Sequence, residues 1–404
     1  MKERLGLERG CIAAEMVYNW YRCSKGVAMA NFIDRLSEQV VQKQVDLKKT
    51  LRQDADSNEA ALARLVKKHW HELPKTGENE RRPAFAVDGS RAVRHLANGA
   101  YLFVAQALII GERVGERLET TDVDVQILPG ATPTPFVERY AELMMHRLEA
   151  RLASIHADTM PKGSVIFLDG ALYGQLPQLY PLGGAQQEIP DKDLPEKILE
   201  HYRHLFEICA TRKLVLVSIA KTSHESAHAQ AWWKQAYGKK QVSQAELPYE
   251  ISDSEVIYRW TDRAAGFSTP ILFGTRSFSD ESRRLLLESI KSAPAIVSFF
   301  VRLADFDDAL RIDVPASSIG RKDKIADVGA EQIIDPKEVI PILELLQADY
   351  GGLEVYNALL YSVDREVRLR QDMMDEVYLM LIQNTLGADV EIRLDRSERR
   401  FHSR

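Results

Sequence analysis

Two short stretches of the sequence decide the fold: Ala84-Phe-Ala-Val-Asp-Gly-Ser-Arg91 and Ser164-Val-Ile-Phe-Leu-Asp-Gly-Ala-Leu172. Each contains a run of apolar residues typical of a buried strand, and each run is followed by an Asp-Gly pair, with Asp88 in the first and Asp169 in the second. Asp-Gly pairs also make good turns. Two interpretations therefore stay open. The pairs are turns that end two strands, or they carry two carboxylates that the fold brings together.

The elements around these stretches follow a characteristic order. Periodicity predicts strands at residues 84–87, 101–110 and 123–128, a helix at 136–156, a strand at 164–168, a helix at 199–209 and a strand at 214–219. Three consecutive strands followed by alternating helices and strands favour a mixed sheet over a doubly wound one. This is the order of a ribonuclease H-like fold, an α/β fold in which helices flank a mixed sheet.

The predicted topology has a geometric consequence for the two aspartates. In a ribonuclease H-like sheet the first strand lies beside the fourth and runs parallel to it. Asp88 and Asp169 would then emerge at the same edge of the sheet, where two close carboxylates repel unless a divalent cation lies between them. Oxygen ligands of this kind suit Mg²⁺ or Mn²⁺. Two such ions about 3.5–4 Å apart activate a water and stabilise the leaving oxygen in phosphodiester cleavage.

A third acid is expected from the helix at 136–156. Glu138, Glu142 and Glu149 share one flank of that helix, beside its apolar stripe. The helix must descend about 11 residues to return to the level of the strand end, which falls between Glu142 and Glu149. A solvated helix face would look the same. Geometry alone therefore leaves both glutamates as candidates.

The remaining segments flank or interrupt this core. Residues 1–78 are predicted to form a helical N-terminal region, whose apolar stripe fits either a core face or a partner surface. Residues 79–390 would form the main domain, with insertions at about 176–196 and 223–250. Residues 391–404 would form a basic tail.

Composition limits the classes of function. The chain has 404 residues, 45% of them hydrophobic and 28% charged, as expected of a globular protein. A net charge of −6 argues against a protein that coats nucleic acid, although it permits a metal nuclease whose carboxylates cations neutralise. The sequence contains no GxxxxGK[ST] loop, so ATP-driven work would come from a partner. Three scattered cysteines, together with the lack of a signal peptide or membrane span, predict a cytoplasmic protein.

A competing motif lies in the second predicted insertion. His224-Glu-Ser-Ala-His228 matches HExxH, the zinc peptidase pattern, in which two histidines on one helix bind Zn²⁺ and Glu225 acts as general base. The segment is polar and does not lie within an apolar helix. A zinc peptidase is therefore the alternative to a nuclease.

Several segments resemble, in the same order, the motifs of the NurA family of nucleases. They are Ala-Val-Asp88-Gly-Ser-Arg91, Leu148-Glu149, Phe-Leu-Asp169-Gly-Ala-Leu172, Val-Ser-Ile-Ala-Lys221, Phe299-Phe-Val-Arg302 with Leu-Arg-Ile-Asp-Val-Pro315, and Tyr356-Asn-Ala-Leu-Leu-Tyr-Ser-Val-Asp364. The last segment departs from the family pattern, because Asn357 replaces a proline and Asp364 replaces a histidine. An aspartate there still suits a hard cation. The resemblance covers about residues 80–370.

The resemblance implies a Mn²⁺-dependent DNA nuclease with 5′→3′ exonuclease and single-strand endonuclease activity in DNA end processing. Mg²⁺ is the alternative metal, and two ions are expected. Family members act as homodimers docked on a hexameric HerA-type translocase, which fits the missing ATP-binding loop. A catalytically inactive docking subunit stays open as a further alternative, since Asp364 departs from the family pattern.

The resemblance also implies roles for individual residues. It favours Glu149 over Glu142 as the helix acid, because the family spacing to the second aspartate motif is closer to that of Glu149. The expected metal ligands are Asp88, Glu149, Asp169 and Asp364. Tyr356 would orient a ligand, a water or the scissile phosphate. The candidate substrate-binding residues are Ser90, Arg91, Lys221 and Arg302. For the three basic residues, which would contact phosphates, surface salt bridging is the alternative.

Overall fold

The computed structural model describes residues 27–50, 57–75, 82–113, 115–172, 191, 193–223, 225–238, 251–274, 291–370 and 373–386. The chain divides into two compact units, Met1–Leu62 and Ala63–Arg404. Within the described residues, no helix has both the length and the apolar character needed to cross a membrane.

The first unit contributes helices α2 (Val27–Gln42) and α3 (Gln44–Thr50). The apolar stripe predicted for this region is exposed, with Leu36 at 50%, Val40 at 49% and Leu47 at 42%. Further along the predicted stripe, Leu62, Leu65 and Val66 of α4 (Ser57–His69) are buried, so the interpretation as a core face is right for α4 and wrong for α2 and α3. The predicted basic tail lies outside the described residues, as do residues 176–190 and 192 of the first predicted insertion and residues 224 and 239–250 of the second.

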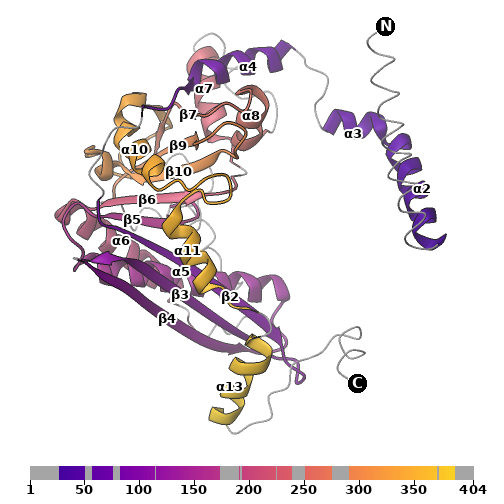
Figure 1. Ribbon diagram of the computed structural model, residues 1–404, viewed down its shortest axis with the longest axis vertical. Helices are drawn as coiled ribbons and strands as arrows, with labels where there is room; N and C mark the ends of the chain where they lie inside the picture. The colour runs from indigo at the N-terminus through magenta and orange to yellow at the C-terminus, as the bar shows by residue number, and fades with distance from the viewer. Residues whose placement is uncertain are drawn as a thin grey trace. The chain divides into compact units, whose positions relative to one another are not determined.

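The second unit is built on one sheet, whose strands lie in the order β1-β7-β9-β10-β6-β5-β2-β3-β4 (Figure 1). Strand β8 also pairs with β9, and β11 pairs with β8. The half of the sheet that ends at β4 contains β2 (Ala84–His95), β3 (Tyr101–Arg113), β4 (Glu116–Leu128), β5 (Val165–Asp169) and β6 (Val215–Ala220). The other strands are β1 (Trp70–His71), β7 (Gly266–Ser268), β8 (Ile271–Phe273), β9 (Ile296–Arg302), β10 (Leu310–Pro315) and β11 (Gln332–Ile333).

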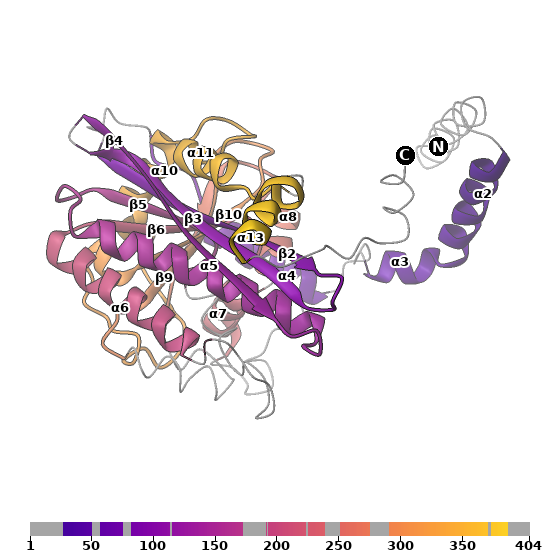
Figure 2. The same cartoon turned by 90° about the horizontal axis from the view of Figure 1, so that it is seen from below.

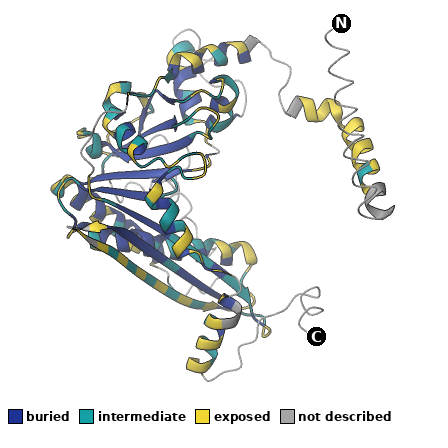
Figure 3. Cartoon of the chain, in the orientation of Figure 1, coloured by how far each residue is buried: buried dark blue, intermediate teal, exposed yellow. Residues whose placement is uncertain are grey.

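Strand pairing confirms the ribonuclease H-like order. Strand β2 is antiparallel to β3, and β3 is antiparallel to β4. On its other side β2 runs parallel to β5, which in turn runs parallel to β6. Strand β10 then continues the sheet antiparallel to β6. In Figure 3 the central strands β5, β6 and β9 are buried along almost their whole length, so they form the interior of this unit.

Several predicted boundaries were wrong. Strand β4 begins at Glu116 and not at residue 123, and helix α6 (Leu194–Arg212) begins five residues before its predicted start at 199. The expected strand at 84–87 continues through Asp88 and Gly89 to His95, because Ser90–His95 keep pairing with Tyr101–Gln106 of β3. Asp88-Gly89 is therefore part of a strand and makes no turn. The second pair does turn, since Gly170 follows the last residue of β5 with a φ of +91°, a conformation that favours glycine.

Helices cover both faces of the sheet (Figure 2). On one face α5 (Thr134–Ala157) and α6 (Leu194–Arg212) pack against Phe85 and Val87. On the other face α10 (Ile340–Ala348) and α11 (Ala358–Val367) pack in the same cluster as Ala86. Successive residues of β2 therefore point to opposite faces, as the pleat of a strand requires.

The structure describes further helices besides those already named. They are α4 (Ser57–His69), α7 (Ala227–Tyr237), α8 (Asp253–Trp260), the 3₁₀ helices Ala316–Ile319 and Pro336–Val339, the π-helical turn Met374–Tyr378, and α13 (Leu379–Leu386).

Candidate functional site

Asp88 and Asp169 meet on the face of the sheet that α11 covers. Val87 of β2 pairs with Leu168 of β5, so the two aspartates follow side by side on parallel strands. Val87 and Leu168 pack toward α5, which directs the next residue of each strand to the opposite face. Asp88 is 7% exposed, and the side chain of Asp169 is 19% exposed.

The electrostatics of Asp88 show that four carboxylates gather here. Burial and the charges of Asp169 and Glu149 together raise the pKa of Asp88 to about 8, with burial as the largest cause. Asp364 contributes in the same direction, while the N–H of Gly89, which donates to Oδ1 of Asp88 at 2.8 Å, opposes the shift. The site therefore carries more negative charge than its own surroundings neutralise.

Helix α5 brings Glu149 to this cluster through the space left by a glycine. A Cβ at position 89 would lie 2.6 Å from Oε1 of Glu149, so only glycine permits the approach. Glu149 is buried and lines, together with Asp169, a small cavity of about 10 Å³. The side chain of Glu142 is 36% exposed and does not line that cavity.

His146 is a site residue that sequence reasoning missed. It is buried, with Nδ1 2.8 Å from Oε2 of Glu149 and Nε2 3.8 Å from Oε1 of Glu142. Burial lowers its pKa, but the charges of Glu149 and Glu142 outweigh that effect and raise the pKa to about 9. A protonated His146 therefore holds the carboxylate of Glu149 in place. The sequence signal was its spacing, four residues after one glutamate and three before the other.

Lys221 and Tyr356 lie beside Asp169. Nζ of Lys221 is 2.9 Å from Oδ2 of Asp169 and 5.1 Å from the centre of the Tyr356 ring. Burial and the charge of Asp169 raise the pKa of Tyr356, so its hydroxyl keeps its proton. This hydroxyl is buried and has no hydrogen-bond partner among the described residues. It is a free donor at the edge of the carboxylate cluster.

Three other predicted residues surround the cluster. Asp364 lies on α11, with Oδ2 3.8 Å from the guanidinium of Arg368. Oγ of Ser90 accepts a hydrogen bond from the N–H of Leu369 at 2.9 Å, which ties β2 to the segment after α11. The side chain of Arg91 is 30% exposed and pairs with Glu138 of α5.

Arg302 does not join this group. It lies at the end of β9, which β10 and β6 separate from β5, and it is 1% exposed. Its guanidinium donates to the hydroxyl of Thr261 and to the carbonyl oxygens of Ala264 and Asp307. A buried guanidinium whose donors are taken by the fold has no face left for a phosphate, so the structure contradicts the predicted phosphate contact.

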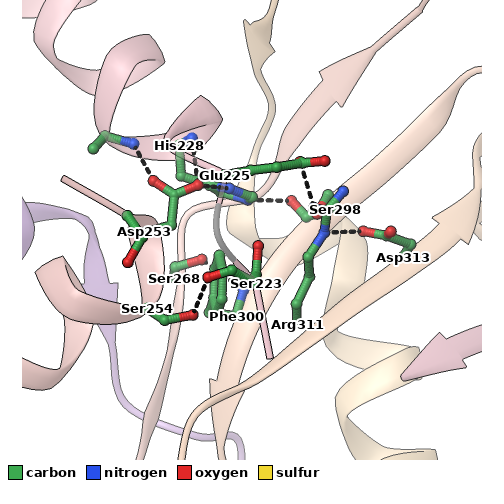
Figure 4. A network of polar contacts seen from close by, with 12 residues as sticks. Ser223, Glu225, His228, Asp253, Ser254, Ser268, Ser298, Phe300, Arg311 and Asp313 are labelled. Carbon is green, nitrogen blue, oxygen red and sulfur yellow. Dashed lines mark hydrogen bonds and ion pairs between the residues drawn. The ribbon is translucent and has the colours of Figure 1, made fainter. Parts of the chain in front are cut away.

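The HExxH pattern does not form a zinc site either (Figure 4). Helix α7 begins at Ala227, so Glu225 lies before the helix and His228 lies on it. His228 is 1% exposed, and both ring nitrogens are occupied, Nδ1 by Oδ2 of Asp253 at 3.1 Å and Nε2 by the carbonyl of Ser298 at 3.0 Å. Glu225 accepts from Arg311. His224 lies outside the described residues. Neither ring nitrogen of His228 is free to bind zinc, which argues against the peptidase alternative.

The carboxylate cluster fits a hard divalent cation in its chemistry. Its donors are carboxylate oxygens, the ligands that Mg²⁺ and Mn²⁺ prefer, and the raised pKa of Asp88 records negative charge that a cation would neutralise. As the side chains stand, the described part of the chain contains no group of three or more His, Cys, Asp or Glu residues placed to hold a metal. Asp169 is engaged by Lys221, and Glu149 by His146.

Solved structures of NurA proteins are similar in fold to this chain. The NurA nuclease from Sulfolobus solfataricus matches with a TM-score of 0.57 at 15% identity, over 88% of this chain and 98% of that chain. A NurA structure bound to dAMP and manganese matches with a TM-score of 0.54 at 15% identity, over 86% and 97%. At this identity the likeness shows the fold.

Sequence comparison gives the family. No curated protein sequence matches the chain. The NurA domain profile, in contrast, matches residues 82–368, which include Asp88, Glu149, Asp169 and Asp364. Because this match covers most of the chain and carries the whole carboxylate cluster, the protein belongs to the NurA family.

Proposed function

We propose that the protein is a divalent-metal-dependent DNA nuclease, with 5′→3′ exonuclease and single-strand endonuclease activity in DNA end processing. The observation that carries the proposal is the cluster of Asp88, Glu149, Asp169 and Asp364, in which the pKa of Asp88 is raised to about 8. Such a concentration of carboxylates is typical of metal sites that hydrolyse phosphodiester bonds. Membership of the NurA family supports this interpretation.

The carboxylates give the site its chemistry. Asp88, Glu149 and Asp169 would hold Mn²⁺ or Mg²⁺, two ions in all, with Asp364 as a further ligand. When bound, the ions supply a water of lowered pKa and neutralise the charge of the leaving oxygen. Asp88 gives up its proton as its carboxylate becomes a ligand, since a pKa of about 8 keeps it mostly protonated near neutral pH.

The surrounding residues would bind and orient the DNA. Lys221 places a positive charge beside Asp169, where it can contact a phosphate oxygen. The unpaired hydroxyl of Tyr356 offers a hydrogen bond to the same phosphate or to the attacking water. Ser90 and Arg91 follow Asp88 on β2 and extend this contact along the strand. His146 keeps Glu149 directed toward the cluster.

The protein would work with partners in the cytoplasm. The sequence contains no ATP-binding GxxxxGK[ST] loop, so translocation along DNA would come from a HerA-type ATPase. A homodimer is proposed as the working form, in line with the family. The residues from about 79 to 390 would form the nuclease domain, and the helical region before them would serve dimerisation or docking.

The proposal is tested by incubating the full-length protein with linear DNA. We expect degradation of single- and double-stranded DNA in Mn²⁺, none in EDTA, and release of label from the 5′ end first. RNA of the same sequence tests the preference for DNA. Absence of cleavage with Mn²⁺ and with Mg²⁺ would contradict the proposal and favour the inactive docking subunit instead.

Glu149 and Glu142 give a matched pair for the helix acid, since both contact His146 from the same helix. We expect Glu149→Gln to lower the rate of DNA hydrolysis by about 10²-fold or more, because glutamine keeps the shape but removes a charge next to Asp88. Glu142→Gln removes a carboxylate outside the cavity and should change the rate by less than about 3-fold. Initial rates at saturating Mn²⁺ measure both, and equal losses would contradict the assignment.

A further inference from the structure

Asp169 is the last residue of β5, and the chain leaves the sheet directly after it. The loop from Asp169 to Leu172 is held by three hydrogen bonds. The N–H of Gly170 donates to the carbonyl of Ile219 at 2.8 Å, and Oγ of Ser218 donates to the carbonyl of Gly170 at 2.6 Å. The third bond runs from the N–H of Leu172 to Oδ2 of Asp313 at 3.2 Å.

The third bond differs from the others because its acceptor is a side chain that lies two strands away from β5. Asp313 lies on β10, in register with Ser218 of β6, and β6 in turn separates β10 from β5. Asp313 is 1% exposed, so its carboxylate has no access to water. A buried carboxylate is costly unless it is paired, which requires that its other oxygen also has a partner.

Arg311 is that partner (Figure 4). Its Nε donates to Oδ1 of Asp313 at 2.9 Å, and its Nη1 donates to Glu225. Arg311 is itself buried, and burial lowers its pKa while the charges of Asp313 and Glu225 outweigh this and raise it. The guanidinium therefore stays charged, and it fixes the carboxylate of Asp313 in the orientation that reaches Leu172.

From this arrangement we propose that Asp313 is a positioning residue for the metal site, and that it sets the direction of the Asp169 carboxylate by fixing the loop that follows it. The inference rests on the proposed function. In the structure Asp169 pairs with Lys221, and metal binding requires its oxygens to turn to a cation while the backbone stays in place. Positioning groups behind metal ligands are typically worth 10–100-fold in metal affinity.

The test replaces Asp313 by asparagine and measures Mn²⁺ binding directly. Asparagine has one acceptor oxygen, so it cannot accept from both Arg311 and Leu172. We expect Asp313→Asn to raise the dissociation constant for Mn²⁺ by about 10–100-fold, measured from the free Mn²⁺ signal in electron paramagnetic resonance without DNA. Excess Mn²⁺ should restore much of the nuclease rate, which it should not do for Asp169→Asn.

Asp253→Asn is the matched control. Asp253 is also buried, at 2% exposure, and it accepts hydrogen bonds from the backbone of α7 and from His228. Its loss should lower thermal stability as much as the loss of Asp313 while leaving Mn²⁺ affinity unchanged. Equal Mn²⁺ affinity in the two variants would overturn the inference, because Asp313 would then be a structural residue alone.

Ser218→Ala is a second variant that tests the same inference if Asp313→Asn fails to fold. It removes the hydrogen bond to Gly170 from the same loop and should weaken Mn²⁺ binding in the same direction. Ser298→Ala, at another buried serine of the same sheet whose hydroxyl has no partner among the described residues, should not. Unchanged Mn²⁺ binding in Ser218→Ala would then count against the inference.

The inference and the proposed function fail in different ways. If wild-type protein binds Mn²⁺ and Asp169→Asn abolishes that binding, the metal site stands whatever Asp313→Asn does. If wild-type protein binds no Mn²⁺, or if Asp169→Asn binds it normally, the proposed site is wrong, and the inference about Asp313 falls with it.

Discussion

Asp88→Asn and Asp169→Asn should each lower the rate of DNA hydrolysis by about 10³-fold at saturating Mn²⁺, which corresponds to about 4 kcal/mol of transition-state stabilisation. Asparagine fits the same space but offers one neutral oxygen in place of a charged pair. The two residues lie on adjacent parallel strands and face the same side of the sheet, so each change removes a ligand from the same site. Rates on linear single-stranded DNA measure the effect.

Asp122→Asn is the control for these variants. The side chain of Asp122 is 21% exposed and 2.7 Å from Arg151, while that of Asp169 is 19% exposed and 2.9 Å from Lys221. The same substitution therefore removes the same kind of ion pair on another strand. Full activity in Asp88→Asn and Asp169→Asn, with both variants folded, would rule out this site.

The order of strands and helices could be predicted because each element carries its own periodicity. Helix α5 and strands β5 and β6 appear within two residues of their predicted bounds. The end of β2 could not be predicted, because Ser90–His95 are held by pairing with β3 and not by a local apolar run. Register across strands is a property of the folded sheet, and Asp-Gly in isolation favours the turn that β2 does not make.

The candidate site shows the same division between local and tertiary information. The sequence pointed to Asp88 and Asp169 because each follows a buried strand. It could not separate Glu149 from Glu142 on residue grounds, since the two share a helix flank and only the gap at Gly89 distinguishes them. His146 gave a weak signal, because its role depends on being buried between both acids.

Two motifs misled for a physical reason. Arg302 is the last residue of an apolar strand, which made it a candidate for contacting phosphate. Its guanidinium instead donates hydrogen bonds to Thr261 and Asp307 in the neighbouring loops. His224 and His228 have the spacing of zinc ligands, but both ring nitrogens of His228 are hydrogen-bonded within the fold. Residue types and spacing state which groups are available, and packing decides which of them are free to react.

In the absence of divalent cations, Asp88→Asn should be more stable than the wild-type protein, and the difference should grow with pH. The pKa of Asp88 is raised from 3.8 to about 8 in the folded state, so the folded protein holds a proton that the unfolded chain releases. The contribution of Asp88 to wild-type stability is therefore greatest below about pH 4 and falls as pH rises toward 8, by up to about 1.4 kcal/mol per pH unit. Asparagine does not titrate, so the free energy of unfolding of the variant does not fall with pH for this reason.

Urea denaturation in EDTA at several pH values between 5 and 8.5 measures the difference. Every other titrating group is common to the two proteins, so the difference between their unfolding free energies isolates the region of Asp88. Asp122→Asn should not reproduce it, since Asp122 is paired with Arg151 and lies outside the carboxylate cluster. Parallel pH dependences for wild type and Asp88→Asn would contradict the electrostatic account of the site.

Adding Mn²⁺ should reverse the order of stability. A ligand that binds only the folded state stabilises it by mass action, and the ionised carboxylate of Asp88 is the form that binds a cation. Wild-type protein should therefore gain stability with Mn²⁺, and gain more at pH 8 than at pH 6, whereas Asp88→Asn gains little. The residue that destabilises the metal-free fold most at high pH is then the one through which the metal stabilises it, which links the electrostatic strain of the site to its catalytic use.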